Sequence, residues 1–268
     1  MANYEDLKSL VQDMGGVVVG YSGGVDSTLV AKIATDELGD GAVSVLIESC
    51  LTPQVEIEEA LELAEALGLN LVRLEVDALA IENLPDNQPD RCYHCKKSLF
   101  SEVIEVAKQR DLPYVLDGAN ADDESDYRPG SKATAELQVR SPLKELGLTK
   151  EQTRAISRDL GLPTWNKPSY ACLASRVPYG TRLTKELLKQ IEDAEAVLRE
   201  LGFTQFRVRH HDGLARIELM RIEMDKLMTD AIRNHVVQEL KSLGYHWVAM
   251  DLAGYRTGSL NEALTLED

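Results

Sequence analysis

The chain has 268 residues, of which 44% are hydrophobic and 28% charged, and its formal net charge is −16. This composition is ordinary for a globular protein of one or two domains, and it excludes collagen-like, coiled-coil and wholly disordered chains. Because so acidic a chain repels phosphate backbones, we expect no nucleic-acid partner. The first residues show no secretory pattern, and no apolar run reaches the ~20 residues that span a bilayer, so we expect a cytoplasmic protein without membrane contact.

The first 165 residues alternate short β-branched runs with amphipathic stretches, a pattern typical of a parallel sheet wrapped by helices. Strands are expected at 16–21, 42–47, 69–76 and 114–117, and helices at 26–38, 54–67, 96–110 and 150–160. We therefore predict an α/β domain with a twisted parallel sheet over residues 1–165.

The pattern changes after residue 165. Residues 168–181 are rich in Pro, Gly, Ser and Tyr and predict an ordered loop. A helix at 184–201, a hairpin of strands at 206–210 and 214–219, a helix at 226–243 and a strand at 246–251 are expected to follow. This order predicts a smaller α+β domain over residues 166–268.

The segment Ser22-Gly23-Gly24-Val25-Asp26-Ser27 lies between a predicted strand and a predicted helix. Its glycines let the backbone present several N–H groups to one anion, in front of the positive end of the helix. The hydroxyls of Ser22 and Ser27 add donors, and Asp26 can hold a Mg²⁺ that bridges phosphates. A tight turn with a capping serine is the simpler alternative, but the full segment in this position predicts a phosphate-binding loop.

No Gly-Lys-Ser/Thr follows, so this segment is not a Walker loop. It resembles the pyrophosphate loop of the PP-loop ATP pyrophosphatase superfamily, which includes NAD synthetase, GMP synthetase and tRNA-thiolating enzymes. The resemblance implies that ATP is cleaved between its α and β phosphates to form an adenylate. Ser49, Asp117 and Gly118 end later strands at the ligand-binding edge of such a sheet, and we assign them, with Arg128, to the ATP site. The run 122–130 around Arg128 is equally explained as a solvated acidic loop.

Three further segments narrow the resemblance to one branch: residues 91–97 (RCYHCKK), 125–130 (SDYRPG) and 170–180 (YACLASRVPYG). With the phosphate loop, they resemble the sulfurtransferases that act on pyridinium-3,5-biscarboxylic acid mononucleotide and build the nickel-pincer nucleotide. This resemblance spans nearly the whole chain. It implies that ATP adenylylates a carboxylate of this small-molecule substrate and that sulfur then displaces AMP, twice per substrate molecule. It also implies a homo-oligomer.

The cysteines decide where the sulfur comes from. Cys172 matches the catalytic cysteine of that family, which in members with this thiol alone gives up its own sulfur and becomes dehydroalanine. Cys92 and Cys95 are also present here, and three thiolates can hold a [4Fe–4S] cluster with one iron free to carry exchangeable sulfide. The sequence resembles the cluster-bearing subset, so we expect the cluster. Zinc, or a pair of structural or redox thiols, are the alternatives for Cys92 and Cys95.

A basic pair on a predicted strand is the candidate site for the substrate phosphate. Arg207 and Arg209 alternate with apolar residues, so both point to one face, where their planar donors match phosphate oxygens. An ordinary exposed strand face is the alternative. The resemblance favours the phosphate, adds Ser175 and Arg176 to it, and makes Glu218 a ligand for a divalent cation or an orienting carboxylate.

Three rival functions remain open. A tRNA-thiolating enzyme would need an extended basic surface, which this acidic chain does not suggest. An ammonia-using ligase similar to NAD synthetase would leave Cys172 unexplained. A module that binds ATP without turnover would release no pyrophosphate with the correct carboxylate present.

Overall fold

The computed structural model describes residues 4–124, 129–168 and 171–261, and it divides into two compact units. The first comprises Met1–Leu84 and Pro89–Tyr170, and the second comprises Pro85–Gln88 and Ala171–Asp268. The short segment Pro85–Gln88 joins the second unit through Asn87, whose side-chain amide donates to the carbonyl of Pro178 at 2.8 Å. The sequence did not predict that a segment within the first 165 residues belongs to the second unit.

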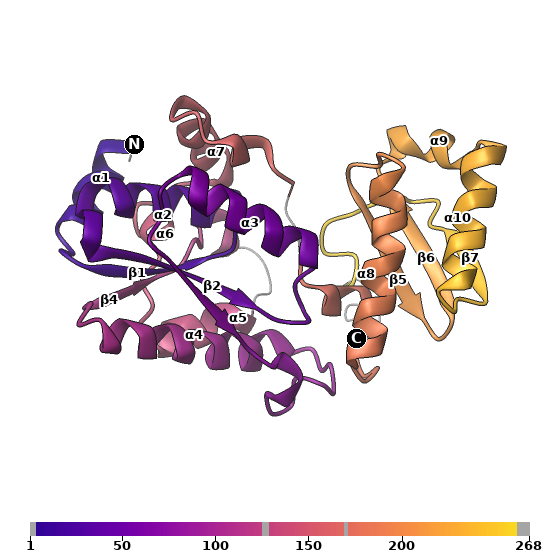
Figure 1. The fold of residues 1–268 in the computed structure, drawn as a ribbon, viewed down its shortest axis with the longest axis horizontal. Coiled ribbons are helices and arrows are strands. Elements are labelled where there is room, and N and C mark those ends of the chain that lie inside the picture. The colour runs from indigo at the N-terminus through magenta and orange to yellow at the C-terminus, as the bar shows by residue number, and fades with distance from the viewer. Residues whose placement is uncertain (1–3, 125–128, 169–170, 262–268) are drawn as a thin grey trace. The chain divides into compact units, whose positions relative to one another are not determined.

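The first unit is the predicted α/β fold, with a four-stranded, all-parallel sheet in the order β3-β2-β1-β4 (Figure 1). Its elements are α1 (Tyr4–Gln12), β1 (Val17–Tyr21), α2 (Val25–Leu38), β2 (Ala42–Glu48), α3 (Gln54–Ala66), β3 (Leu71–Glu75), α4 (Arg91–Gln109), β4 (Tyr114–Leu116), α5 (Pro129–Glu136), α6 (Pro142–Glu145) and α7 (Lys150–Asp159). Helix α4 begins five residues before its expected start at residue 96. The sequence did not predict α1, α5 or α6.

Both faces of this sheet are buried, as a parallel sheet requires. Val17 and Val19 of β1 pack in one apolar cluster with α1 and α2, whereas Val18 packs in another with Val103 of α4. Figure 1 shows α1 and α2 on one side of the sheet and α4 with α5 on the other. Because the strands are parallel, the loops that leave β1, β2 and β4 lie together at the carboxyl ends of the strands, and the predicted phosphate loop is one of them.

The second unit contains a three-stranded sheet in the order β5-β6-β7, in which β5 is antiparallel and β7 parallel to β6. Its elements are α8 (Lys185–Glu200), β5 (Phe206–His211), β6 (Leu214–Leu219), α9 (Met224–Met228), α10 (Asp230–Ser242) and β7 (Trp247–Met250). The single helix expected at 226–243 is divided at Thr229, whose backbone is extended. No helix within the described residues has the length and apolar character needed to cross a membrane.

The two faces of the second sheet differ in chemistry. Phe206 and Val208 point into an apolar core formed with α8 and α10. Arg207 and Arg209 alternate with them and therefore point to the opposite face, which is polar but buried. This alternation gives the second unit an apolar side that stabilises it and a charged side available for chemistry.

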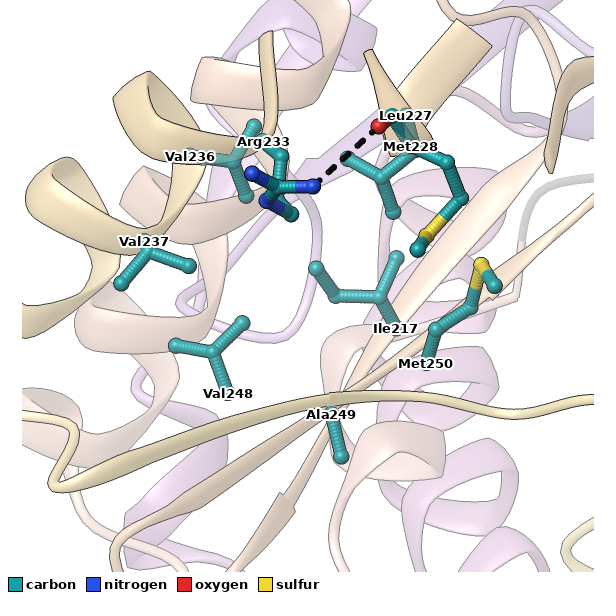
Figure 2. Close-up of a pocket in the computed structure, with 9 residues that line it drawn as sticks. All are labelled: Ile217, Leu227, Met228, Arg233, Val236, Val237, Val248, Ala249 and Met250. Atoms are coloured by element: carbon teal, nitrogen blue, oxygen red, sulfur yellow. Dashed lines mark hydrogen bonds between the residues drawn. The ribbon is translucent and has the colours of Figure 1, made fainter. Parts of the chain in front are cut away.

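One pocket of the second unit lies between the sheet and the helices α9 and α10 (Figure 2). Its lining is apolar except for Arg233, which donates to the carbonyl of Met228 at 3.4 Å. The lining residues are Ile217, Leu227, Met228, Arg233, Val236, Val237, Val248, Ala249 and Met250. None of them was predicted to belong to a site, and none offers a nucleophile or an acid–base group.

Two adjacent histidines at the end of β5 make the stability of the second unit dependent on pH. Burial lowers the pKa of His210 and of His211, and the nearby Arg216 cation lowers that of His211 further. The His211 Nε2 accepts a hydrogen bond from Arg216 Nε at 3.3 Å, so this nitrogen is unprotonated. His210 packs against Tyr245, and its buried Nδ1 has no partner.

Because the folded state holds these histidines neutral, the unfolded chain binds more protons, and the free energy of unfolding falls as the pH is lowered. We expect urea unfolding to show this loss between about pH 7.5 and about pH 5.5, around the usual histidine pKa. A His210→Asn/His211→Asn double variant should show a flatter dependence. His235→Asn, at a side chain that is 51% exposed, is the control. An unchanged slope in the double variant would contradict the assignment.

Candidate active site

The phosphate loop begins where β1 ends and reaches the first turn of α2. Gly23 has φ +68°, and a Cβ at this position would lie 2.7 Å from the Cβ of Ala60 on α3, so only glycine fits. Tyr21 fixes that contact, because its hydroxyl donates to the Ala60 carbonyl at 3.0 Å. Burial raises the pKa of Tyr21 to about 12, so the hydroxyl keeps the proton that it donates. Gly24 is the N-cap residue of α2 and has no side chain to cap the helix. The first N–H groups of α2 are thus open to an anion.

The two serines of the loop have different roles. Ser27 is buried, and its Oγ accepts a hydrogen bond from the backbone N–H of Ser22 at 3.2 Å, which closes the curl of the loop. The Ser22 and Ser27 hydroxyls are 2.9 Å apart. Ser22 is exposed. Ser27 therefore shapes the loop, and Ser22 is the hydroxyl that a ligand can reach.

The turn after β4 is pressed against this loop. A Cβ on Gly118 would lie 2.7 Å from the backbone nitrogen of Ser27, so the close approach requires glycine. Asp117 is buried and uses its carboxylate to accept from the Ala119 N–H at 3.0 Å and the Ser141 hydroxyl at 2.6 Å. Asp117 thus shapes the turn that places Gly118 against the loop.

The structure brings two further side chains to Asp26 that the sequence did not assign to the site. The Asn120 amide donates to Asp26 Oδ1 at 3.2 Å, and the Lys150 ammonium pairs with Asp26 Oδ2. Lys150 is the first residue of α7, and Thr149 and Gln152 hold this turn in a capping box. The sequence predicted a helix at 150–160, but nothing local connects Lys150 with a loop 124 residues earlier. The one available signal was that the segment 22–27 contains no cation of its own.

Two other predicted ATP contacts receive less support. Ser49 follows β2 at the same edge of the sheet, and its Oγ accepts from the Leu51 N–H at 3.3 Å within a turn. Arg128 lies outside the described residues, as does most of the run 125–130. Both assignments remain predictions.

Cys92 and Cys95 lie in the first two turns of α4, and their spacing of three places both on one side of the helix. Both side chains are partly buried. Helix α5 packs closely here, because a Cβ on Gly130 would lie 3.3 Å from the Cys92 carbonyl oxygen. His94 between them contacts Asp90 at 3.3 Å. Its ring is therefore engaged with the residue that precedes the helix.

Across the described residues, no three His, Cys, Asp or Glu side chains are grouped to hold a metal ion. Cys92 and Cys95 belong to the first unit and Cys172 to the second, and the two units are described separately. Neither unit alone contains all three cysteines of the predicted cluster. The three-cysteine cluster therefore stays a prediction.

Cys172 is exposed and immediately precedes a short helical turn, Leu173–Arg176. The buried side chain of Arg176 holds this turn in place. Its guanidinium is 1% exposed, pairs with both carboxylate oxygens of Glu195 at 2.9 and 3.0 Å, and donates to the carbonyls of Ala171 and Cys172 at 2.5 and 3.1 Å. The backbone of Cys172 is thus held while its thiol faces solvent.

Arg209 ties the same turn to the charged face of the sheet. Its guanidinium donates to the Ser175 carbonyl, to Glu218 and to the Ser259 hydroxyl, each at 2.7 Å, while its buried Nε has no partner. Glu218 is fully buried and also pairs with Arg216 at 3.2 Å. Because two arginines already neutralise this carboxylate, the contacts favour the orienting role for Glu218 over a cation ligand.

The basic pair does not form the exposed strand face that the sequence left open as the alternative, since Arg207 and Arg209 are only 3% and 6% exposed. Chain segments distant from β5, including the Cys172 turn and Ser259, cover it. Burial and the Arg176 cation lower the pKa of Arg207, whose guanidinium also lies 5.1 Å from the Tyr255 ring centre. Because burial and a neighbouring cation disfavour the charged form of Arg207, an anionic ligand beside it would be favourable.

Comparisons with known proteins find relatives that match nearly the whole chain. Residues 3–92 match the family model for NAD synthase, which covers the phosphate loop and ends in the first turn of α4. A pyridinium-3,5-bisthiocarboxylic acid mononucleotide synthase of Lactiplantibacillus plantarum is 40% identical over 260 residues, which make up 97% of this chain and 94% of that protein. The chain belongs to this synthase family.

Other relatives agree with that placement. An uncharacterized protein of Synechocystis sp. is 41% identical over 262 residues, 97% of both chains. A glutamine-hydrolyzing GMP synthase of Aeropyrum pernix is 29% identical over 220 residues, which are 73% of this chain and 42% of that enzyme. The resemblance inferred from the motifs is confirmed, and membership of the synthase family makes the protein an enzyme of the PP-loop type.

The ion pair beneath Cys172 predicts a strong stability effect. Glu195→Ala would leave the Arg176 guanidinium buried without its carboxylate and should lower the free energy of unfolding by about 3–5 kcal/mol in urea titrations. Glu195→Gln, which keeps an acceptor for the Val208 N–H, should cost less. Glu200→Ala, at an exposed position of the same helix, is the control. Equal stability of Glu195→Ala and Glu200→Ala would contradict the structural role of the pair.

Proposed function

We propose that this protein transfers sulfur to the carboxylates of pyridinium-3,5-biscarboxylic acid mononucleotide, giving thiocarboxylates, AMP and pyrophosphate in the biosynthesis of the nickel-pincer nucleotide. The observation that carries the proposal is the 40% identity to a bisthiocarboxylic acid mononucleotide synthase across 97% of the chain, which includes both the phosphate loop and Cys172. The GMP synthase relatives, by contrast, cover 72–74% of the chain.

ATP binding is assigned to the edge of the first sheet. The N–H groups at the start of α2 and the Ser22 hydroxyl would donate to the phosphates, and Ser27, Gly118 and Asp117 would keep the loop in shape. Asp26 is a suitable ligand for Mg²⁺, which when bound neutralises phosphate charge. A substrate carboxylate oxygen then bonds to the α-phosphorus while the bond from the α-phosphorus to the bridging oxygen breaks, and pyrophosphate leaves.

Sulfur transfer is assigned to Cys172. A sulfur nucleophile bonds to the activated carbonyl carbon, the carbon–oxygen bond to AMP breaks, and AMP leaves with the electron pair. Arg176 and Glu195 hold the backbone of Cys172 in place while leaving its thiol exposed. Two such cycles convert both carboxylates of one substrate molecule.

The substrate phosphate is assigned to the charged face of the second sheet. Arg207 and Arg209 are its proposed ligands, since Arg207 lies among cations and Arg209 has a buried Nε without a partner. Ser175 lies between this face and Cys172. Arg176 is already engaged with Glu195 and three groups of its own turn, so its contacts support a positioning role.

We further propose that Cys92, Cys95 and Cys172 hold a [4Fe–4S] cluster. The donor types fit, because cysteine thiolates hold such clusters, and Cys92 and Cys95 lie on the same side of α4. Such a cluster supplies exchangeable sulfide, so that one protein molecule can act repeatedly. The competing route uses the Cys172 sulfur itself, which leaves its Cβ together with loss of the Hα proton and gives dehydroalanine.

Cys172→Ala separates the two half-reactions. We expect this variant to release pyrophosphate when ATP and the dicarboxylate are added, but to form no thiocarboxylate, because activation does not need the thiol. Enzymatic pyrophosphate assay and product mass spectrometry measure the two steps. Cys50→Ala is the control and should behave as the wild type. Full product formation by Cys172→Ala would contradict the proposal, and an amide product with ammonia would indicate a ligase.

Anaerobic purification tests the cluster independently. The wild type should contain iron and acid-labile sulfide at about four each per cluster, and Cys92→Ala should lose both. Intact mass after turnover should be unchanged. A colourless wild type after anaerobic reconstitution, or the loss of one H₂S from Cys172 during turnover, would overturn the cluster and favour the sacrificial route.

A further inference from the structure

We propose that Lys150 binds the β- and γ-phosphates of ATP and so provides the cation that the phosphate loop lacks. This inference rests on the proposed function, because it requires ATP as a substrate. It assigns a role to a residue that neither the motifs nor the sheet topology placed in the site.

The charge distribution at the loop calls for such a group. Residues 22–27 contain a carboxylate, Asp26, but no Lys or Arg, whereas a Walker loop carries its own lysine against the phosphates. The leaving pyrophosphate develops negative charge during adenylation, and neutral N–H and O–H donors offset only part of it. Lys150 is the ammonium that pairs with Asp26 in the loop itself.

The backbone of Lys150 is held by a closed ring of contacts. Its N–H donates to Asp122 at 2.9 Å, the Asp122 N–H donates to the Asn120 side-chain oxygen at 3.0 Å, and the Asn120 amide donates to Asp26 at 3.2 Å. The Lys150 ammonium closes the ring on Asp26. The capping box at the start of α7 fixes the same turn. This ring keeps the lysine beside the loop whether or not its side chain is paired.

The side chain itself is free to exchange partners. Lys150 and Asp26 are 29% and 18% exposed, and an ion pair that is partly exposed to water is weak. Asp26 can turn to Mg²⁺ when the nucleotide binds, and the four-carbon stem of Lys150 then allows its ammonium to swing to a phosphate of the same ligand. The ion pair therefore keeps the Lys150 ammonium beside the phosphate loop in the absence of ATP.

The alternative is that this ion pair only ties α7 to α2. A purely structural tie would affect every nucleotide that uses the loop, and it would affect protein stability. A phosphate ligand would affect only nucleotides that carry β- and γ-phosphates. ATP and AMP therefore distinguish the two roles.

The experiment is calorimetric titration of the full chain with Mg²⁺ and either α,β-methylene-ATP, which resists cleavage, or AMP. Lys150→Ala should weaken binding of the ATP analogue by about 10-fold or more, as expected for a charged hydrogen bond, and should change AMP binding less than about twofold. Lys150→Arg should restore part of the affinity. Lys32→Ala is the control, because Lys32 lies on α2, pairs with Asp36 and is similarly exposed at 27%.

Unchanged or tighter binding of the analogue by Lys150→Ala would overturn the proposal, and so would an equal loss of the analogue and AMP. Should Lys150→Ala fail to fold, Lys150→Gln removes the charge, retains a donor for Asp26 and faces the same criteria. A wild type that binds neither nucleotide would instead refute the proposed function, so that the two failures are distinguishable.

Discussion

The contact between Gly118 and the backbone of Ser27 shapes the proposed nucleotide site. Parallel strands bring the ends of β1 and β4 to one edge, but only the absence of a side chain at Gly118 lets the turn after β4 touch the first turn of α2. Through this contact Asn120 comes within hydrogen-bond distance of Asp26. The start of α7 is then connected to the same carboxylate. Three separate parts of the chain thus form one site because one position has no Cβ.

The second unit solves a different problem, which is to hold an exposed thiol in place. A short turn with few contacts would move freely, and a thiol buried deeply enough to be rigid could not reach a substrate. Arg176 resolves this conflict, since it is buried with Glu195 and donates to the carbonyls of Ala171 and Cys172, which lie on either side of the Cys172 α-carbon. The same charged layer extends to Arg209 and Glu218, so the turn and the proposed phosphate ligands form one connected network.

The parts of this protein that depend on local sequence were predictable. The strand, glycine turn and helix around residues 22–27 are adjacent in the chain, and so are the two strands of the hairpin predicted at 206–210 and 214–219. The start of α4 was missed because its first residues, RCYHC, lack the apolar period that reveals a helix. Lys150 and the burial of Arg207 could not be predicted, because both depend on contacts between residues far apart in sequence. Arg128 stays a prediction.

The small segment Pro85–Gln88 has a consequence for how this protein can be divided. The polypeptide passes between the units three times, at residues 84–85, 88–89 and 170–171. A fragment that starts at residue 171 would lack Asn87, whose amide contacts Val177 and Pro178, and the Pro85 carbonyl, which accepts from the Leu183 N–H at 2.7 Å. The unit that carries Cys172 therefore cannot be moved to another protein as one continuous segment, because it consists of two separate pieces of the chain.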